Sequence, residues 1–177
     1  RTGTSVRIPA STLDGLETSD EGRLAVWLRR GFLTLLLLFV LAGLLGLLGV
    51  HTTTSRASED GWTVSLEHPG VARPGLDVVW EVTVTHAGGF DGDVTLAVSG
   101  DYFDIFESQG FEPQPSDETR DGSYYYLTFN KPPGDTLTVS FDAYVQPASQ
   151  IGRSGTLSVV DAGRRVASVD FRTFLMP

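Results

Sequence analysis

The pattern of hydrophobic and polar positions divides the chain into two parts with different periods. Residues 31–50 contain no charged side chain, and Thr34 is their only polar one. At about 1.5 Å per residue, a helix over this run is about 30 Å long, which matches the hydrocarbon core of a bilayer. Because one segment can satisfy its backbone hydrogen bonds in lipid only as a helix, the run predicts a transmembrane helix.

Beyond residue 60, apolar and polar positions alternate with a period of two. The clearest example is residues 76–85, where Leu76, Val78, Trp80, Val82 and Val84 share one face. The same alternation marks residues 62–67, 94–98 and 137–145. Residues 124–129 are also predicted to be a strand, residues 156–160 and 166–174 a terminal hairpin around Asp161–Arg164, and a short strand is possible at 102–106. Alternation of this kind is typical of half-buried strands, so this part is predicted to be an all-β sandwich.

These patterns predict four segments. Residues 1–22 show no persistent period and are expected to be a flexible cytoplasmic tail. Residues 23–50 form a juxtamembrane and transmembrane helix whose apolar span is 31–50. Residues 51–60 are expected to be a polar linker, and residues 61–177 the sandwich, which is large enough for one core.

The distribution of Arg residues predicts how the helix is oriented. Arg23, Arg29 and Arg30 precede the apolar run, whereas residues 51–65 contain only Arg56, beside Glu59 and Asp60. The positive-inside rule then places the N-terminus in the cytoplasm and the C-terminal domain outside the plasma membrane. The run is longer than a typical signal-peptide core and no small-x-small site follows closely, so an uncleaved single-pass anchor is expected.

Composition narrows the classes of function. Residues 51–177 hold 8 Lys and Arg against 18 Asp and Glu, a net charge of −10. Such acidity argues against nucleic acid, whose phosphates require a basic footprint. The chain has no Cys, which excludes disulfides, zinc–thiolate sites and Cys nucleophiles.

Small residues in the apolar run are candidates for helix packing. Ala42 and Gly46 are four residues apart, and Gly43, Gly46 and Gly49 recur at every third position. Small side chains let a second helix approach closely in lipid, so Ala42, Gly43, Gly46 and Gly49 are predicted to contact a partner helix. The alternative is that glycine is simply common in membrane helices.

Catalytic and metal-binding patterns are weak. The chain contains no Gly-x-Ser-x-Gly and no His-x-x-x-His motif, and its three His residues lie near turns or the linker. Acidic loops near Asp91, Asp101 and Asp117 offer oxygen ligands for calcium, but lack EF-hand spacing. We therefore predict a non-enzymatic protein with no metal and no cofactor.

An aromatic stretch leaves two interpretations open. Tyr102, Phe103, Phe106 and Phe111 lie in a segment with weak strand character. Alternation lets only about half of them face a core, so the others would form an exposed surface that binds a partner. The alternative is that the loop folds back and buries them.

Residues 71–88 carry a recognisable pattern. A Pro74-Gly75 turn is followed by alternating Val around Trp80 and by a turn containing Gly88, and residues 133–141 echo it from Pro133-Gly134. This pattern resembles bacterial immunoglobulin-like surface modules of the cell-adhesion-related and conserved-repeat types, over about residues 61–175. The resemblance implies an immunoglobulin-like β-sandwich of about 7–8 strands. It departs from those families in having one module on a membrane anchor, and it implies no site residues.

Two functional hypotheses follow. The first is a non-catalytic, single-pass accessory subunit of a larger bacterial membrane complex, with a polytopic membrane protein or other subunits and the lipid bilayer as partners. The second is a cell-surface adhesion module for cell-wall glycan or protein. Glycan sites usually present exposed aromatic side chains, and Trp62 and Trp80 fall on predicted inward rows, which favours the first hypothesis.

Overall fold

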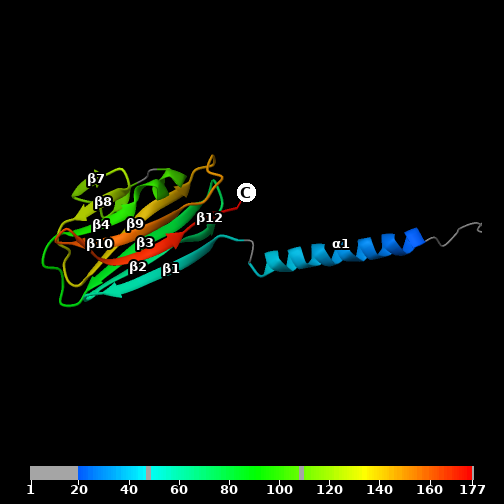
Figure 1. Cartoon of the computed structure of the whole chain (residues 1–177), viewed down its shortest axis with the longest axis horizontal. Coiled ribbons are helices and arrows are strands. Elements are labelled where there is room, and N and C mark those ends of the chain that lie inside the picture. The colour runs from blue at the N-terminus through cyan, green and yellow to red at the C-terminus, as the bar shows by residue number, and fades with distance from the viewer. Residues whose placement is uncertain (1–19, 47–48, 108–109, 177) are drawn as a thin grey trace, which may run out of the picture. The chain divides into compact units, whose positions relative to one another are not determined.

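A computed structural model describes residues 20–46, 49–107 and 110–176 (Figure 1). Residues 1–48 and 49–177 form two separate compact units. The first contains the helix α1 (Asp20–Leu44), and the second contains two β-sheets. The predicted tail, as far as residue 19, lies outside the described residues, and Asp20–Gly22 belong to α1 rather than to the tail.

The helix α1 is exposed and strongly apolar. Its segment Gly22–Leu44 spans 23 residues with a mean hydropathy of 2.0, long and apolar enough to cross a membrane. Its large side chains are exposed, among them Trp27 at 71% and Leu44 at 78%. The predicted apolar helix therefore exists.

The predicted end of the helix at residue 50 is wrong. The helix ends at Leu44, and the backbone N–H groups of Leu45 and Gly46 then donate to Leu41 (2.9 Å) and Gly43 (3.0 Å). Gly46 has φ +73°, a left-handed conformation that closes a helix and favours glycine. Gly46 and Gly49 thus lie beyond the helix, and only Ala42 and Gly43 of the predicted packing stripe are on it.

The first sheet has the strand order β1-β2-β3-β9-β5, with β12 pairing with β2 and β6 with β9. Its pairs are antiparallel except that of β12 with β2. Its strands are β1 (His51–Glu59), β2 (Trp62–Ala72), β3 (Asp77–His86), β9 (Thr136–Val145), β5 (Phe106–Glu107), β6 (Phe111–Glu112) and β12 (Phe174–Leu175).

The second sheet is antiparallel throughout and has the order β11-β10-β4-β8-β7. Its strands are β11 (Arg164–Arg172), β10 (Ser154–Asp161), β4 (Val94–Ser99), β8 (Tyr124–Phe129) and β7 (Asp117–Arg120). The two sheets share one hydrophobic core, which takes residues from β2, β3 and β9 on one side and from β4, β8, β10 and β11 on the other.

Most predicted inward rows are confirmed. On β3, Trp80, Val82 and Val84 are buried, with Trp80 only 1% exposed, although Leu76 before the strand is 43% exposed. On β9 every second residue from Leu137 to Val145 is buried. The mostly-β fold and the alternation that predicted it therefore agree.

The predicted linker at residues 51–60 is wrong. Residues His51–Glu59 form β1, which pairs with β2 over its whole length, from His51 opposite Val71 to Glu59 opposite Trp62. Residues 51–59 show no alternation of apolar and polar side chains, because β1 is an edge strand whose side chains are mostly exposed. The missed signal was Asp60-Gly61, whose φ values of +50° and +81° suit a two-residue hairpin turn.

The short strand considered possible at residues 102–106 is a helix over most of its length. Residues Gly100–Ile105 form a 3-10 helix, η1, and only Phe106 continues into a strand. Tyr102 and Ile105 are three residues apart, so one turn of this helix directs both into the core.

The Asp60-Gly61 turn provides a test of the β1–β2 hairpin. Gly61→Ala places a Cβ on a residue with φ +81°, and should lower the free energy of unfolding of the domain by about 1 kcal/mol. Gly92→Ala is the matched control, because Gly92 is exposed and has open space around it. Urea unfolding of the full chain in detergent, followed by tryptophan fluorescence, measures both. Equal stability of the two variants would contradict the hairpin.

Candidate functional site

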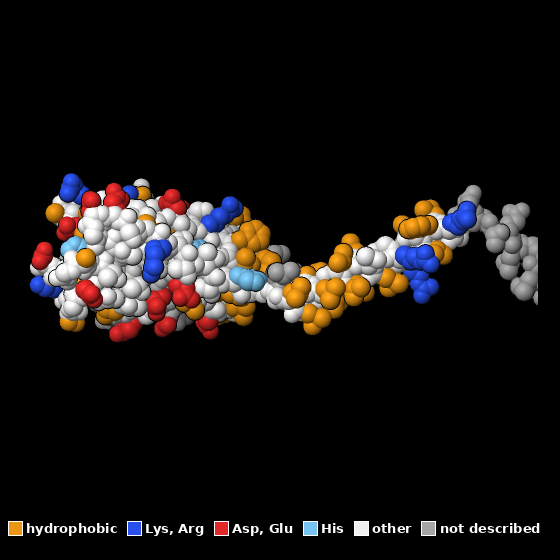
Figure 2. All heavy atoms as spheres, turned by 90° about the horizontal axis from the view of Figure 1, so that it is seen from below, with side chains coloured by type: hydrophobic (Ala, Val, Ile, Leu, Met, Phe, Trp, Pro, Cys, Tyr) orange, Lys and Arg blue, Asp and Glu red, His pale blue; other side chains and the backbone are white. Residues whose placement is uncertain are grey.

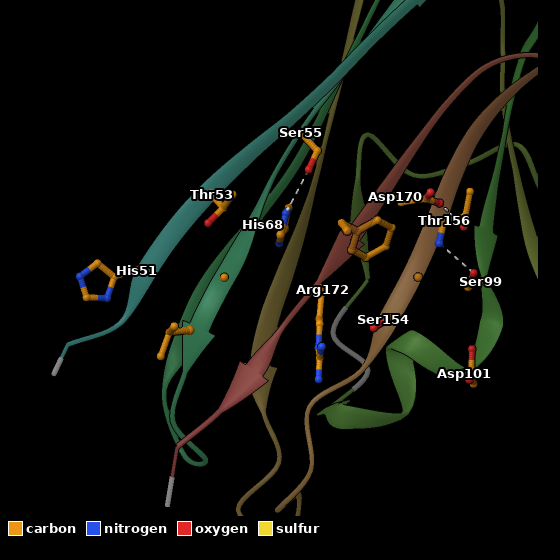
Figure 3. A pocket seen from close by; sticks show the side chains of 14 residues that line it. His51, Thr53, Ser55, His68, Ser99, Asp101, Ser154, Thr156, Asp170 and Arg172 are labelled. Atoms are coloured by element: carbon orange, nitrogen blue, oxygen red, sulfur yellow. Dashed lines mark hydrogen bonds between the residues drawn. The ribbon is translucent and has the colours of Figure 1, made fainter. Parts of the chain in front are cut away.

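A polar groove with a volume of about 920 Å³ lies between β1–β2 of the first sheet and β10–β11 of the second (Figure 3). The strands β1 and β11 are the edge strands of the two sheets on this side. His51, Thr53 and Ser55 line it from β1, and Asp170 and Arg172 line it from β11. The groove is thus built from residues that the sequence assigned to a linker and to a terminal hairpin.

Two glycines keep the groove walls close to the neighbouring side chains. A Cβ on Gly70 of β2 would lie 2.3 Å from Oγ1 of Thr53, and one on Gly155 of β10 would lie 2.8 Å from Cζ of Phe171. Neither distance is tolerable for a carbon atom. A larger residue at either position would force the facing side chain, Thr53 or Phe171, to move.

Several polar groups in the groove are already hydrogen-bonded to each other. The Thr156 hydroxyl donates to Oδ1 of Asp170 at 2.7 Å, and the Thr156 backbone N–H donates to Oγ of Ser99 at 2.9 Å. Figure 3 shows these contacts on the β10–β11 wall and places Arg172 at some distance along the same wall. The wall is therefore held in place by its own hydrogen bonds, while the exposed Arg172 and His51 offer polar groups to solvent.

His68 is the buried titratable group of the groove. It is 2% exposed, packs against Phe171 with ring centroids 5.5 Å apart, and has Nε2 3.4 Å from the Ser55 hydroxyl. Burial lowers its pKa, an effect partly opposed by the Pro69 carbonyl 3.4 Å from Nδ1. Nδ1 thus faces a backbone carbonyl, rather than the carboxylate that orients the histidine in many hydrolases.

A chain of buried hydrogen bonds lies beside His68. The Thr173 hydroxyl donates to the Pro69 carbonyl at 2.7 Å, and because its proton is used there, the Tyr102 hydroxyl donates to Thr173 at 2.8 Å. Tyr102 and Thr173 are both 0% exposed, and burial raises the pKa of Tyr102. This chain joins η1, β2 and the C-terminal segment, which are distant in sequence.

The predicted exposed aromatic surface is wrong, and the alternative of burial is confirmed. Tyr102, Phe106 and Phe111 are 0%, 3% and 8% exposed, and Phe103 is partly buried against the core. Their rings pack edge to face, for example Tyr102 on Phe106 with centroids 5.4 Å apart. The 3-10 helix and the pairing of β5 and β6 with β9 direct all four inward, which simple alternation did not allow for.

A second, smaller recess lies beside this aromatic cluster. It has a volume of about 170 Å³ and is lined by Phe103, Phe111, Phe141, Tyr125 and Glu118. The Tyr125 hydroxyl donates to the Glu118 carboxylate. Burial, reinforced by that carboxylate, raises the pKa of Tyr125 to about 12. The ring centroids of Phe103, Phe111 and Phe141 are within 5.7 Å of one another, so the rings pack together and leave only a shallow space.

The acidic loops serve the turns in which they lie. The Asp121 carboxylate accepts hydrogen bonds from the backbone of Ser123 (2.8 Å) and Tyr124 (2.7 Å), which lowers its pKa. Asp93 accepts one from the backbone of Lys131 at 2.9 Å. In the part of the chain that the structure describes, no group of three or more His, Asp or Glu side chains is placed to hold a metal ion.

The roles that the sequence predicted for residues of α1, in helix packing and in membrane orientation, stay predictions. Ala42 and Gly43 lie in the last turn of α1, and Arg23, Arg29 and Arg30 lie exposed on the same helix. Arg29 and Arg30 directly precede the apolar run, as the orientation prediction requires. The described residues contain no second α-helix against which packing of α1 can be judged.

No protein-family model matches this chain, and neither does any curated protein.

The buried hydrogen-bond chain predicts a ranking of two variants. Tyr102→Phe removes one donor and should lower the free energy of unfolding by about 1 kcal/mol. Thr173→Val keeps the shape but leaves the Pro69 carbonyl and the Tyr102 hydroxyl unpaired, and should cost about 2–3 kcal/mol. Chemical unfolding of the full chain gives both values. If Thr173→Val lowered the free energy of unfolding no more than Tyr102→Phe does, these buried hydrogen bonds would not stabilise the domain in the way argued.

The buried His68 predicts a pH dependence of stability. Its pKa is lowered in the folded chain, so below the ordinary histidine value of about 6.5 the unfolded chain binds more protons. The free energy of unfolding should therefore decrease as the pH falls from about 7 to 5. His68→Gln should flatten this decrease, whereas His51→Gln, at an exposed position, should not. Parallel pH profiles for both variants would contradict the assignment.

Proposed function

We propose that this chain is a membrane-anchored, non-catalytic accessory subunit of a larger bacterial membrane complex. In this proposal α1 spans the plasma membrane with its N-terminus in the cytoplasm, and the two-sheet domain stands on the outer side. Partners are a polytopic membrane protein or other subunits of the complex, together with the bilayer itself.

One observation carries the proposal: the chain passes from helix to sheet without a stalk. Six residues, 45–50, separate the end of α1 at Leu44 from the start of β1 at His51. An extended chain gains at most about 3.6 Å per residue, so β1 begins within about 25 Å of the helix end. Adhesion modules usually lift their binding surface away from the membrane, whereas a subunit that contacts membrane-embedded partners is held close.

The character of the domain supports a binding role. Two sheets that share a core, with Trp80 and Trp62 buried, fit the immunoglobulin-like sandwich that the resemblance implies. A β-sandwich is a rigid support for binding surfaces at its edges and ends. The burial of both tryptophans leaves neither as the flat, exposed aromatic platform typical of glycan-binding modules, so adhesion to cell wall is the weaker candidate.

The partner-binding surfaces are expected on α1 and along the polar groove. Apart from the partly buried Ala42, the residues of α1 from Gly22 to Leu44 are exposed, and their side chains are available to lipid or to another helix. Because Gly46 lies beyond the helix end, the close-approach surface is reduced to Ala42 and Gly43. Of the four residues predicted to pack against a partner helix, the proposal therefore keeps Ala42 and Gly43.

The proposal is tested by altering the distance between helix and domain in the full chain. Inserting a flexible Gly/Ser segment of about 20 residues between Val50 and His51 adds about 25 Å of average reach without changing either unit. We expect the chain expressed at its native level to run on native gels within a large complex, and the insertion variant to lose it.

A matched control repeats the same insertion before residue 20, where it leaves the spacing between helix and domain unchanged. That variant should remain in the complex. Recovery of the unmodified chain only as a free monomer from mild detergent would refute the accessory-subunit role. A complex that survives the insertion after Val50 would show that proximity to the membrane is not required, and would favour the adhesion alternative.

A further inference from the structure

One end of the two-sheet domain has an unusual composition. We call it the proximal end, because it is where the chain enters β1, and it comprises residues 49–51, 71–76, 146–154 and 172–176. The strand register brings these segments together. His51 of β1 and Phe174 of β12 both pair with Val71 of β2, Ser154 pairs with Arg172, and Asp77 after the second segment pairs with Tyr144 before the third.

Exposed apolar side chains gather at this end. Five large hydrophobic residues of the described part of the domain are exposed, and four of them are proximal: Val50 (39%), Leu76 (43%), Ile151 (79%) and Phe174 (53%). The fifth, Val79, is on β3. Figure 2 shows orange side chains grouped at the end of the domain beside a pale blue histidine. Clustered exposure of this kind marks an interaction surface.

The proximal segments are held rigidly against one another. Backbone N–H groups of Thr173, Met176 and Gly75 donate to the carbonyls of Arg153 (2.8 Å), Ala72 (2.9 Å) and Val145 (2.8 Å). A Cβ on Gly152 would lie 1.9 Å from the Thr173 carbonyl oxygen and 2.9 Å from Cα of Phe174. Ile151 and Phe174 therefore belong to one continuous surface that is formed before any partner binds.

Charge at the proximal end differs from that of the domain as a whole. The domain is strongly acidic, yet the proximal residues 49–51, 71–76, 146–154 and 172–176 contain none of the 22 Asp and Glu residues of the chain. The same segments carry Arg73, Arg153 and Arg172, all exposed. Asp77 directly follows the second of these segments and Asp170 lies two residues before the fourth, while Asp101 lines the groove with Ser154 and Arg172. Apolar and aromatic side chains mixed with Arg suit the boundary between phospholipid head groups and acyl chains.

The covalent connection brings this end to the bilayer. Between Gly31, where the apolar run begins, and Leu44, the helix supplies 14 residues, or about 21 Å, which is shorter than a hydrocarbon core of about 30 Å. The apolar run continues through Leu45 to Val50. Once α1 spans the bilayer, the outer lipid boundary therefore falls between the helix end at Leu44 and the start of β1 at His51.

From these observations we infer that the proximal end docks on the phospholipid head-group layer. Ile151 and Phe174 insert into the head-group and upper acyl region, and Arg153 and Arg172 contact lipid phosphates. The inference rests on the anchored topology of the proposed function, but it does not require any protein partner. The β1 strand then stands on the membrane directly, and the acidic remainder of the domain faces away from it.

The absence of cysteine makes a direct test simple. Full-length Ile151→Cys, Phe174→Cys and Ala162→Cys chains are labelled with an environment-sensitive fluorophore. They are reconstituted into vesicles of phosphatidylcholine, alone or mixed equally with phosphatidylglycerol. Ala162 is the control, since it is exposed on the β10–β11 turn, at the opposite end of β10 from Ser154. Lipids that carry a nitroxide quencher near the head group report depth.

Labels at 151 and 174 should be quenched severalfold more strongly than the label at 162, at a depth of about 5–10 Å below the head groups. Anionic lipid should strengthen that quenching, and Arg153→Glu with Arg172→Glu should cancel the increase. Equal quenching at all three positions would overturn the inference. Labels at 151 and 174 that are exposed in pure vesicles yet shielded in native membranes would also overturn the inference, because a protein would then cover the proximal end. The vesicles contain no partner, so this outcome is independent of whether a complex exists.

Discussion

The pairing of β1 with β2 is the interaction on which the rest of this structure depends. It begins at His51, directly where the apolar run ends, and continues to Glu59. Because residues 51–59 form an edge strand, only residues 45–50 separate the end of α1 from the first strand of the domain. The pairing also forms one wall of the polar groove, and in the topology that we propose it brings the proximal end within reach of the lipid boundary.

Sequence patterns predicted the parts of the fold that are determined by residues close together in the sequence. A run of apolar residues without charge identified α1, and period-two alternation identified β3, β4, β8 and β9 with most of their buried rows. The turn at Asp161–Arg164 followed from its residues, since Ala162 and Gly163 adopt φ values of +47° and +76°. Each of these features is decided by neighbours in sequence.

Most of the predictions that failed concern residues whose structure depends on partners distant in the sequence. The strand β1 has no apolar row and exists because β2 offers a complete register. Tyr102 and Phe106 are buried because Thr173 and β9 lie opposite them. The helix ends early because Gly46 adopts a left-handed conformation, which a composition-based span cannot detect. The groove joins β1 to β11, residues more than 100 positions apart, so its residues could not have been grouped from the sequence.

The central claim is that the domain is held at the membrane by a direct helix-to-strand connection. The most direct measurement is the height of Ala162 above the bilayer, from energy transfer between a dye at Ala162→Cys and acceptor lipids around the reconstituted full chain. The 9 residues of β11 separate this turn from the proximal end, so the account predicts one narrow distance of about 30 Å. A broad distribution, or a height of about twice that value, would show that the domain moves on a tether and would contradict the account.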